Sequence, residues 1–109
     1  MADFGIIHIS FLPAEGMALF PFILIKKKTY KTDALLIRHE RIHLRQQAEM
    51  AVIFFYLFYL LNYIFNLLLY RNHRQAYLNI IFEKEAYTME GEVDYLRMRR
   101  PFAWIKFIF

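Results

Sequence analysis

The chain contains no cysteine, three glycines and three prolines in 109 residues. The absence of cysteine excludes a disulfide scaffold, thiolate metal sites and cysteine catalysis. Neither glycine nor proline occurs between Phe22 and Glu90, so this long stretch can be largely helical. Apolar residues are abundant instead: 59% of the chain is hydrophobic and 19% is aromatic. That composition excludes intrinsic disorder, because the chain is rich in the residues that drive burial.

Positive charge is in mild excess, with 14 Lys and Arg against 10 Asp and Glu. The resulting net charge of +4 suits an anionic membrane surface or nucleic acid and by itself selects neither. Asp3 stands where a secretory signal would be basic, and Pro13, Glu15 and Gly16 interrupt the first apolar stretch. With no signal peptide evident, we expect a cytoplasmic protein, or one attached to the membrane from the cytoplasmic side.

The positions of glycine and proline, together with the apolar pattern between them, predict a mostly helical α+β fold in a single domain, residues 1–109. A short N-terminal strand pair is expected, with residues 4–12 as a strand or irregular arm and residues 17–26 as a second strand. Pro21 would confine that second strand to a sheet edge. A basic loop ends the strand arm at residue 31. The other predicted segments are a helix over 32–49 capped by Thr32 or Asp33, an apolar helix over 51–70, an amphipathic helix over 75–98 with a break at Gly91, and a C-terminal apolar segment over 101–109.

The pattern with chemical content is His39-Glu40-Arg41-Ile42-His43, an H-E-x-x-H motif. On a helix, residues i and i+4 share a face, so both imidazoles can reach one metal ion. Glu40 projects beside that ion, where its carboxylate can take a proton from a metal-bound water. The motif therefore predicts a zinc site with His39 and His43 as ligands and Glu40 as the general base.

A third ligand is expected later in the chain, and Glu83 and Glu85 are the candidates. The two positions lie roughly 200° apart on a helix, so only one of them can face the histidines. Here the sequence resembles the gluzincin branch of the zincin metallopeptidases, in which a later helix carries an E-x-x-A-D motif. The resemblance selects Glu83 as the ligand and places Ala86 on the motif's alanine, with Glu85 as the fallback. Tyr87 stands where the family has aspartate.

The resemblance implies a zinc-dependent peptidase with a helical core. It also suggests supporting or oxyanion-stabilising roles for Tyr87 and for Gln46, which follows the first motif in an H-x-x-Q pattern. The whole chain is also similar to a group of small, uncharacterised bacterial proteins that share HERIHLRQQ-like and FEKEAY-like segments. That second similarity implies no substrate.

Geometry limits how the helices can be arranged. One straight helix over 34–70 would carry the chain about 40 Å past His43, and Glu83 could not return. We therefore expect a turn near residues 47–50, after which residues 51–70 rise beside the first helix and residues 75–98 descend. In that three-helix arrangement the ligands would lie about 10–18 Å above the turn.

Residues 51–70 are about as long as a bilayer span. Crossing the membrane would separate Glu83 from His39 and His43, so we expect this helix to be buried in the protein or to lie partly in the membrane. Asn62 and Asn66 support this expectation, because both prefer protein partners.

The leading functional prediction is a minimal zinc metallopeptidase that hydrolyses peptide bonds. The alternatives are a non-enzymatic, membrane-associated protein with a structural or regulatory metal site, and a helical partner protein without metal. The candidate partners are a peptide or protein substrate, a membrane surface and a second copy of the chain, with no nucleic acid. The predicted edge strand over residues 17–26 discriminates between these functions. An enzyme would leave this strand open above the site, and a structural protein would cover it.

Overall fold

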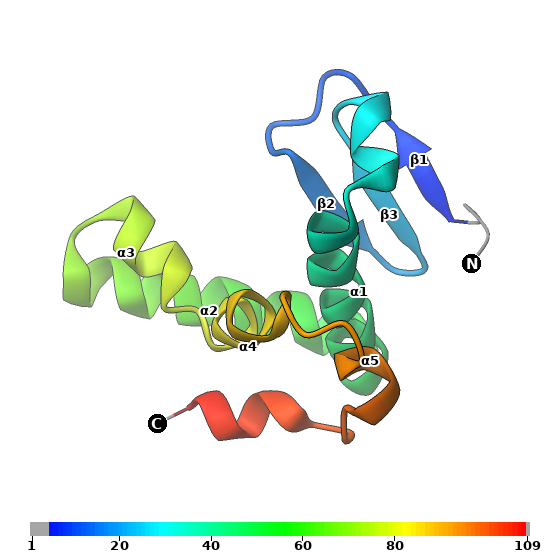
Figure 1. Cartoon of the computed structure of the whole chain (residues 1–109). Coiled ribbons are helices and arrows are strands. Elements are labelled where there is room, and N and C mark those ends of the chain that lie inside the picture. The colour runs from blue at the N-terminus through cyan, green and yellow to red at the C-terminus, as the bar shows by residue number, and fades with distance from the viewer. Residues whose placement is uncertain (1–4, 109) are drawn as a thin grey trace.

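The computed structural model describes residues 5–108 and confirms a mostly helical α+β fold, in which an N-terminal sheet precedes the helices (Figure 1). The elements in chain order are β1 (Ile6–His8), β2 (Gly16–Leu19), β3 (Phe22–Ile25), the 3-10 helix η1 (Lys28–Thr32), α1 (Ala34–Glu49), α2 (Ile53–Tyr70), α3 (His73–Leu78), α4 (Ile81–Met89), α5 (Tyr95–Met98) and the 3-10 helix η2 (Ala103–Phe107).

The sheet has three strands in the order β1-β3-β2, so the predicted strand pair was wrong by one strand. Residues 17–26 do not form one strand, because Phe20 and Pro21 make a tight turn between β2 and β3. β3 lies in the centre, parallel to β1 and antiparallel to β2. β2 is therefore the edge strand that faces the rest of the molecule.

The helix that carries the H-E-x-x-H motif begins as expected. Asp33 is its N-cap, and the Asp33 side chain accepts a hydrogen bond of 3.1 Å from the backbone of Leu36. Ile37 then packs against Ile23 and Ile25 of the central strand in a small apolar core. This contact orients α1, so that the face bearing His39 and His43 turns toward α4.

The turn between the first two long helices lies at residues 50–52, slightly later than the predicted 47–50. Ala51 and Val52 both have positive φ angles, of 53° and 59°. Glycine is the usual residue at such angles, and because alanine and valine stand here instead, the sequence carries no turn signal. α2 then leaves the end of α1 sideways rather than rising beside it (Figure 1), so the predicted side-by-side arrangement was wrong.

The predicted helix over 75–98 is in fact three shorter helices, α3, α4 and α5. The break at Gly91 is present, and a second break at Asn79 and Ile80 separates α3 from α4. The backbone of Ile81 donates a hydrogen bond of 2.8 Å to the Asn62 side chain of α2. Because α2 supplies this acceptor, α4 can begin in a new direction and bring Glu83 beside α1.

A second apolar core joins α2, α4 and the C-terminal segment. Phe55, Ile80 and Phe82 are its buried members, and the Phe82 ring stacks on Phe55 and meets Trp104 of η2 edge-on. The predicted C-terminal apolar segment is thus a short 3-10 helix packed on α4.

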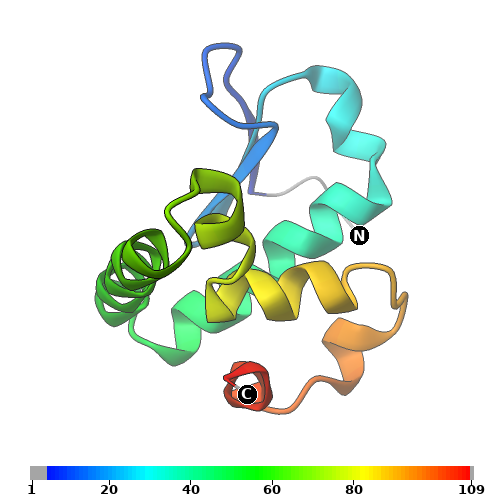
Figure 2. The same cartoon turned by 90° about the vertical axis from the view of Figure 1, so that its left-hand side faces the viewer.

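α2 itself is mostly exposed, so the expectation of burial in the protein was wrong, whereas the alternative of a position partly in the membrane stays a prediction. Only Phe55 and Asn66 of its 18 residues are buried. By length and composition this helix could cross a membrane. α3 packs along it, as both views show (Figures 1 and 2).

Candidate metal centre

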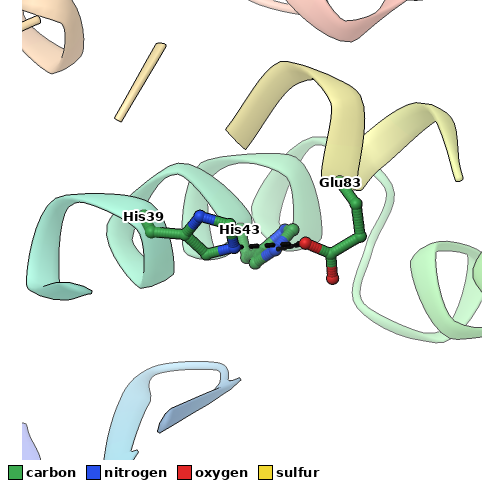
Figure 3. A group of neighbouring side chains, drawn as sticks. All are labelled: His39, His43 and Glu83. Carbon is green, nitrogen blue, oxygen red and sulfur yellow. Dashed lines mark hydrogen bonds and ion pairs between the residues drawn. The ribbon is translucent and has the colours of Figure 1, made fainter. Parts of the chain in front are cut away.

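Three buried side chains from two helices converge on one point. His39 and His43 extend from α1, and Glu83 reaches them from α4 (Figure 3). The Oε1 atom of Glu83 lies 3.1 Å from Nε2 of His39 and 3.0 Å from Nε2 of His43. The potential ligand atoms of the three residues all lie within 4.8 Å of one another. The structure thus brings together the three residues that the sequence singled out as ligands.

The other ring nitrogen of His43 is held by Gln46. Nδ1 donates a hydrogen bond of 2.7 Å to the Gln46 amide oxygen. This direction follows from the amide nitrogen of Gln46, which donates to the Phe82 carbonyl and to Glu85 and so turns the amide oxygen toward the ring. Gln46 therefore sets the His43 tautomer.

Glu90 has the same relation to His39. Its carboxylate accepts a hydrogen bond of 2.8 Å from His39 Nδ1. The backbone carbonyl of Glu90 also accepts a bond of 2.6 Å from Arg38, which ties the end of α4 to α1. From the sequence, Glu90 was expected to be solvated, although it lies two helical turns after Glu83.

With both Nδ1 atoms occupied as donors, neutral imidazoles present lone pairs at Nε2. Both lone pairs then face a carboxylate oxygen at about 3 Å. A carboxylate oxygen and an imidazole lone pair repel each other at this distance unless a proton or a metal ion lies between them. Neighbouring ligand atoms around a tetrahedral zinc ion are about 3.3 Å apart, close to the two distances from Glu83 Oε1 to the histidines. The donor set therefore fits a divalent metal such as zinc.

The charges in the metal-free site agree with this arrangement. Burial by itself would lower the pKa of His43, but the Glu83 carboxylate outweighs burial and raises it to about 9. Burial likewise opposes ionisation of Glu83, yet His43 and the hydrogen bonds from both histidines hold its pKa well below the usual range. The site thus keeps an anionic ligand ready, and the proton on His43 lies where a cation could bind.

Tyr59 of α2 fixes the second oxygen of Glu83. Its hydroxyl donates a hydrogen bond of 2.5 Å to Oε2. Burial, reinforced by the nearby carboxylate, raises the pKa of Tyr59, so the hydroxyl remains a donor. Sequence reasoning missed this residue, because a tyrosine in a long apolar helix carries no signal of its partner.

Glu85 does not contact the histidines, and it reaches the site through Gln46, which donates a hydrogen bond to it. Its carboxylate accepts hydrogen bonds from Arg99 and from the Tyr95 hydroxyl. Arg99 also pairs with Glu49 of α1. Glu85 is therefore an ion-pair partner that joins α4 to α1 and to the segment after α5.

Glu40 lies beside the three converging side chains and lines a hollow with them. It is buried, and burial raises the pKa of its carboxyl group despite the nearby histidines. Within residues 5–108, no group donates a hydrogen bond to this carboxylate. Glu40 is thus free to bond a water molecule or a ligand in the hollow.

Two hollows, of about 300 and 700 Å³, meet at this site. Both are lined by Gly16 of β2, by His39 and Glu40 of α1 and by Tyr77 of α3. A Cβ atom on Gly16 would lie 3.4 Å from the Glu40 carboxylate, so glycine lets the edge strand pass close to it. Together the hollows form a cleft that runs past the three converging side chains.

The edge strand is open along one part of this cleft and closed along another. Lys26 bonds to the Glu15 carbonyl, so the pairing pattern turns the backbone groups of Gly16 and Ala18 away from β3. The Ala18 carbonyl accepts hydrogen bonds from Gln47 and Tyr56. Gly16 lies on the cleft wall.

Tyr87, suggested for a supporting or oxyanion role, lies behind His39. Its ring meets the His39 ring edge-on at 4.4 Å, and its hydroxyl pairs with the Tyr77 hydroxyl at 3.0 Å. Tyr77, rather than Tyr87, lines both hollows. Tyr87 therefore supports the His39 ring by packing.

His39, His43 and Glu83 are thus a buried group that could hold a metal ion. No protein-family model, curated protein or solved structure matches the chain.

Proposed function

We propose that the chain is a zinc-dependent metallopeptidase of the gluzincin type. The observation that carries this proposal is the convergence of two Nε2 lone pairs and one carboxylate oxygen, with both Nδ1 atoms already used as donors. His39, His43 and Glu83 would hold the ion, and a water molecule would complete the tetrahedron.

A zinc ion bound there would acidify its water and polarise the substrate carbonyl. Glu40 supplies the proton acceptor. Its free carboxylate lines the same hollow, and its raised pKa suits a group that accepts a proton and then donates it to a leaving amine. Gln46 and Glu90 keep the imidazoles oriented, and Tyr59 keeps Glu83 oriented.

The cleft along β2 supports a peptide as the substrate. An extended chain laid beside Gly16 would pass directly over Glu40, with room on both sides for side chains.

Glu40→Gln is the decisive variant, with Glu92→Gln as the matched control in an exposed loop. We expect both proteins to retain about one zinc per chain, since neither change removes a ligand. Hydrolysis of a pool of unfolded peptides, assayed with added zinc, should fall about 100-fold or more in Glu40→Gln only. Unchanged turnover in that variant would contradict the proposed mechanism.

The alternative is a metal site without catalysis. The closure of the β2 edge at Ala18 by Gln47 and Tyr56 favours it. In that case wild type binds zinc but hydrolyses no peptide, and Glu40→Gln has no functional cost. The same pair of measurements, metal content and turnover, therefore separates the two functions.

A further inference from the structure

The outer side of α2 is a continuous apolar surface. Its buried and half-buried residues, Phe55, Tyr59, Asn62, Tyr63 and Asn66, lie on one side of the helix and face the protein. The opposite side carries only large apolar side chains, each 45–75% exposed. This outer face consists of Ile53, Phe54, Leu57, Leu60, Leu61, Ile64, Phe65 and Leu68. An exposed apolar surface of this size is typical of a site that binds a membrane or another protein.

The charged residues that follow α2 directly in the sequence are of one sign. No Asp or Glu occurs between Glu49 and Glu83, whereas Arg71 and Arg74 follow the end of α2. η2 runs in the same direction as α2 in both views (Figures 1 and 2). Phe102, directly before η2, and Ile105 within it are exposed, and Lys106 is the one charged residue of η2. Exposed apolar side chains bordered by cations fit a bilayer that contains anionic lipids.

The packing of α3 determines how the helix can lie. Asn66 donates a hydrogen bond to the Ala76 carbonyl, and Tyr63 pairs with His73, so α3 follows the inner side of the C-terminal half of α2. A membrane-crossing α2 would carry the exposed Arg74 of α3 into the hydrocarbon, which is costly. With the helix lying in the plane of the membrane, α3 stays in water.

From these observations we infer that α2 docks the protein on an anionic lipid surface, lying in the membrane plane with its outer face in the lipid. The cleft lies on the other side of the same helix, where Tyr56 and Tyr59 form part of its wall. Docking therefore holds the cleft just above the membrane surface. The inference depends on neither zinc nor Glu40, so it stands or fails separately from the proposed function.

Vesicle flotation tests the docking. Wild type should bind vesicles of equimolar phosphatidylcholine and phosphatidylglycerol, and bind pure phosphatidylcholine more weakly. Leu61→Asp should lower the partition coefficient about tenfold or more, because it places a charge in the lipid. Val93→Asp is the matched control, since Val93 is also an exposed apolar residue (76% against 54% for Leu61) but lies in the loop after α4. Equal binding by wild type and Leu61→Asp would overturn the inference.

The oligomeric state of the protein without lipid tests whether a second copy of the chain, rather than a membrane, covers the outer face. Should wild type form a stable dimer that Leu61→Asp splits, with no vesicle binding by either protein, a second copy covers the outer face and the inference is wrong. Circular dichroism of both proteins checks that the exposed substitution leaves the fold intact.

The orientation can be measured because the chain contains no cysteine. Nitroxide labels on Leu57→Cys and Leu68→Cys should report the same shallow depth in the membrane. A crossing helix would separate the two labels by about 16 Å in depth, and that result would overturn the in-plane placement.

Discussion

The two long helices are built in opposite ways. α1 has 16 residues and buries seven, of which five are polar or charged: His39, Glu40, His43, Gln46 and Gln47. α2 has 18 residues, buries only Phe55 and Asn66, and exposes the large apolar side chains of its outer face. Ordinary core packing would bury the second set and expose the first. The contrast teaches that neither helix is shaped by core packing alone. A candidate metal site accounts for the burial of polar groups in α1, and the proposed lipid contact would account for the exposure of α2.

Removing a metal ligand from α1 should have the largest effect, because it should abolish metal binding while leaving α2 unchanged. His39→Ala or His43→Ala should reduce bound zinc from about one ion per chain to almost none, because two ligands alone hold zinc weakly. Elemental analysis of protein purified without chelator measures this. His8→Ala, in the exposed strand β1, is the control. Metal-free wild type would contradict the zinc site itself, whereas vesicle binding through α2 should be unaffected in all variants.

Two carboxylates on α4 should respond in opposite ways. Glu83→Gln should abolish zinc binding. Glu85→Gln should keep the zinc site but lower the free energy of unfolding by about 3 kcal/mol, because Arg99 loses a buried ion-pair partner. Chelator competition and urea denaturation of the metal-free proteins separate the effects. Equal zinc affinity in Glu83→Gln and wild type would show that Glu83 is no ligand.

The pH dependence should show that zinc replaces a proton in α1. The pKa of His43 is raised to about 9 in the metal-free site, so zinc must displace its proton at lower pH. Affinity should therefore rise about tenfold per pH unit from pH 7 and level off near pH 9. Calorimetry in two buffers should detect the released proton, and a pH-independent affinity would exclude this linkage.

The raised pKa of His43 has the opposite consequence for the metal-free protein, whose free energy of unfolding should fall as the pH rises. Because the folded-state pKa of His43 lies above its unfolded value, the stabilisation is complete below about pH 6.5. It should be lost as pH rises through about 9. Urea denaturation of chelator-treated protein at several pH values measures this loss.

Loss of an orienting group should weaken the site without removing it. Glu90→Ala takes away the acceptor of His39 Nδ1 and should reduce zinc affinity about 10- to 100-fold. Glu92→Ala, two residues later and exposed, should leave the affinity unchanged. If the two variants bind zinc equally, Glu90 has no part in orienting His39.

The smallest effect is expected at the junction of the two helices. Ala51→Gly should raise the free energy of unfolding by about 1 kcal/mol, because glycine adopts the positive φ there without steric cost. Ala48→Gly, at an exposed position inside α1, should lower it by about the same amount. Destabilisation by both substitutions would mean that the turn conformation is not strained.

The sequence alone determined the features that depend on local spacing. The i, i+4 spacing of His39 and His43 places both on one helix face, and the Asp33 cap sets where that helix begins. The need for a turn before α2 followed from helix length alone. Glu83 was separated from Glu85 by helical angle together with a family resemblance, and the structure places only Glu83 beside the histidines.

Only the tertiary structure decided the features that depend on partners far apart in the chain. The break between α3 and α4 depends on Asn62, 19 residues before Ile81. Glu90 and Tyr59 reach the site across 51 and 24 residues of sequence, and no local pattern identifies such a partner. The sideways course of α2 follows from positive φ angles at Ala51 and Val52, which the sequence does not signal. The spacing of residues along one helix follows directly from the sequence, whereas contacts between side chains far apart in the sequence depend on how the helices pack.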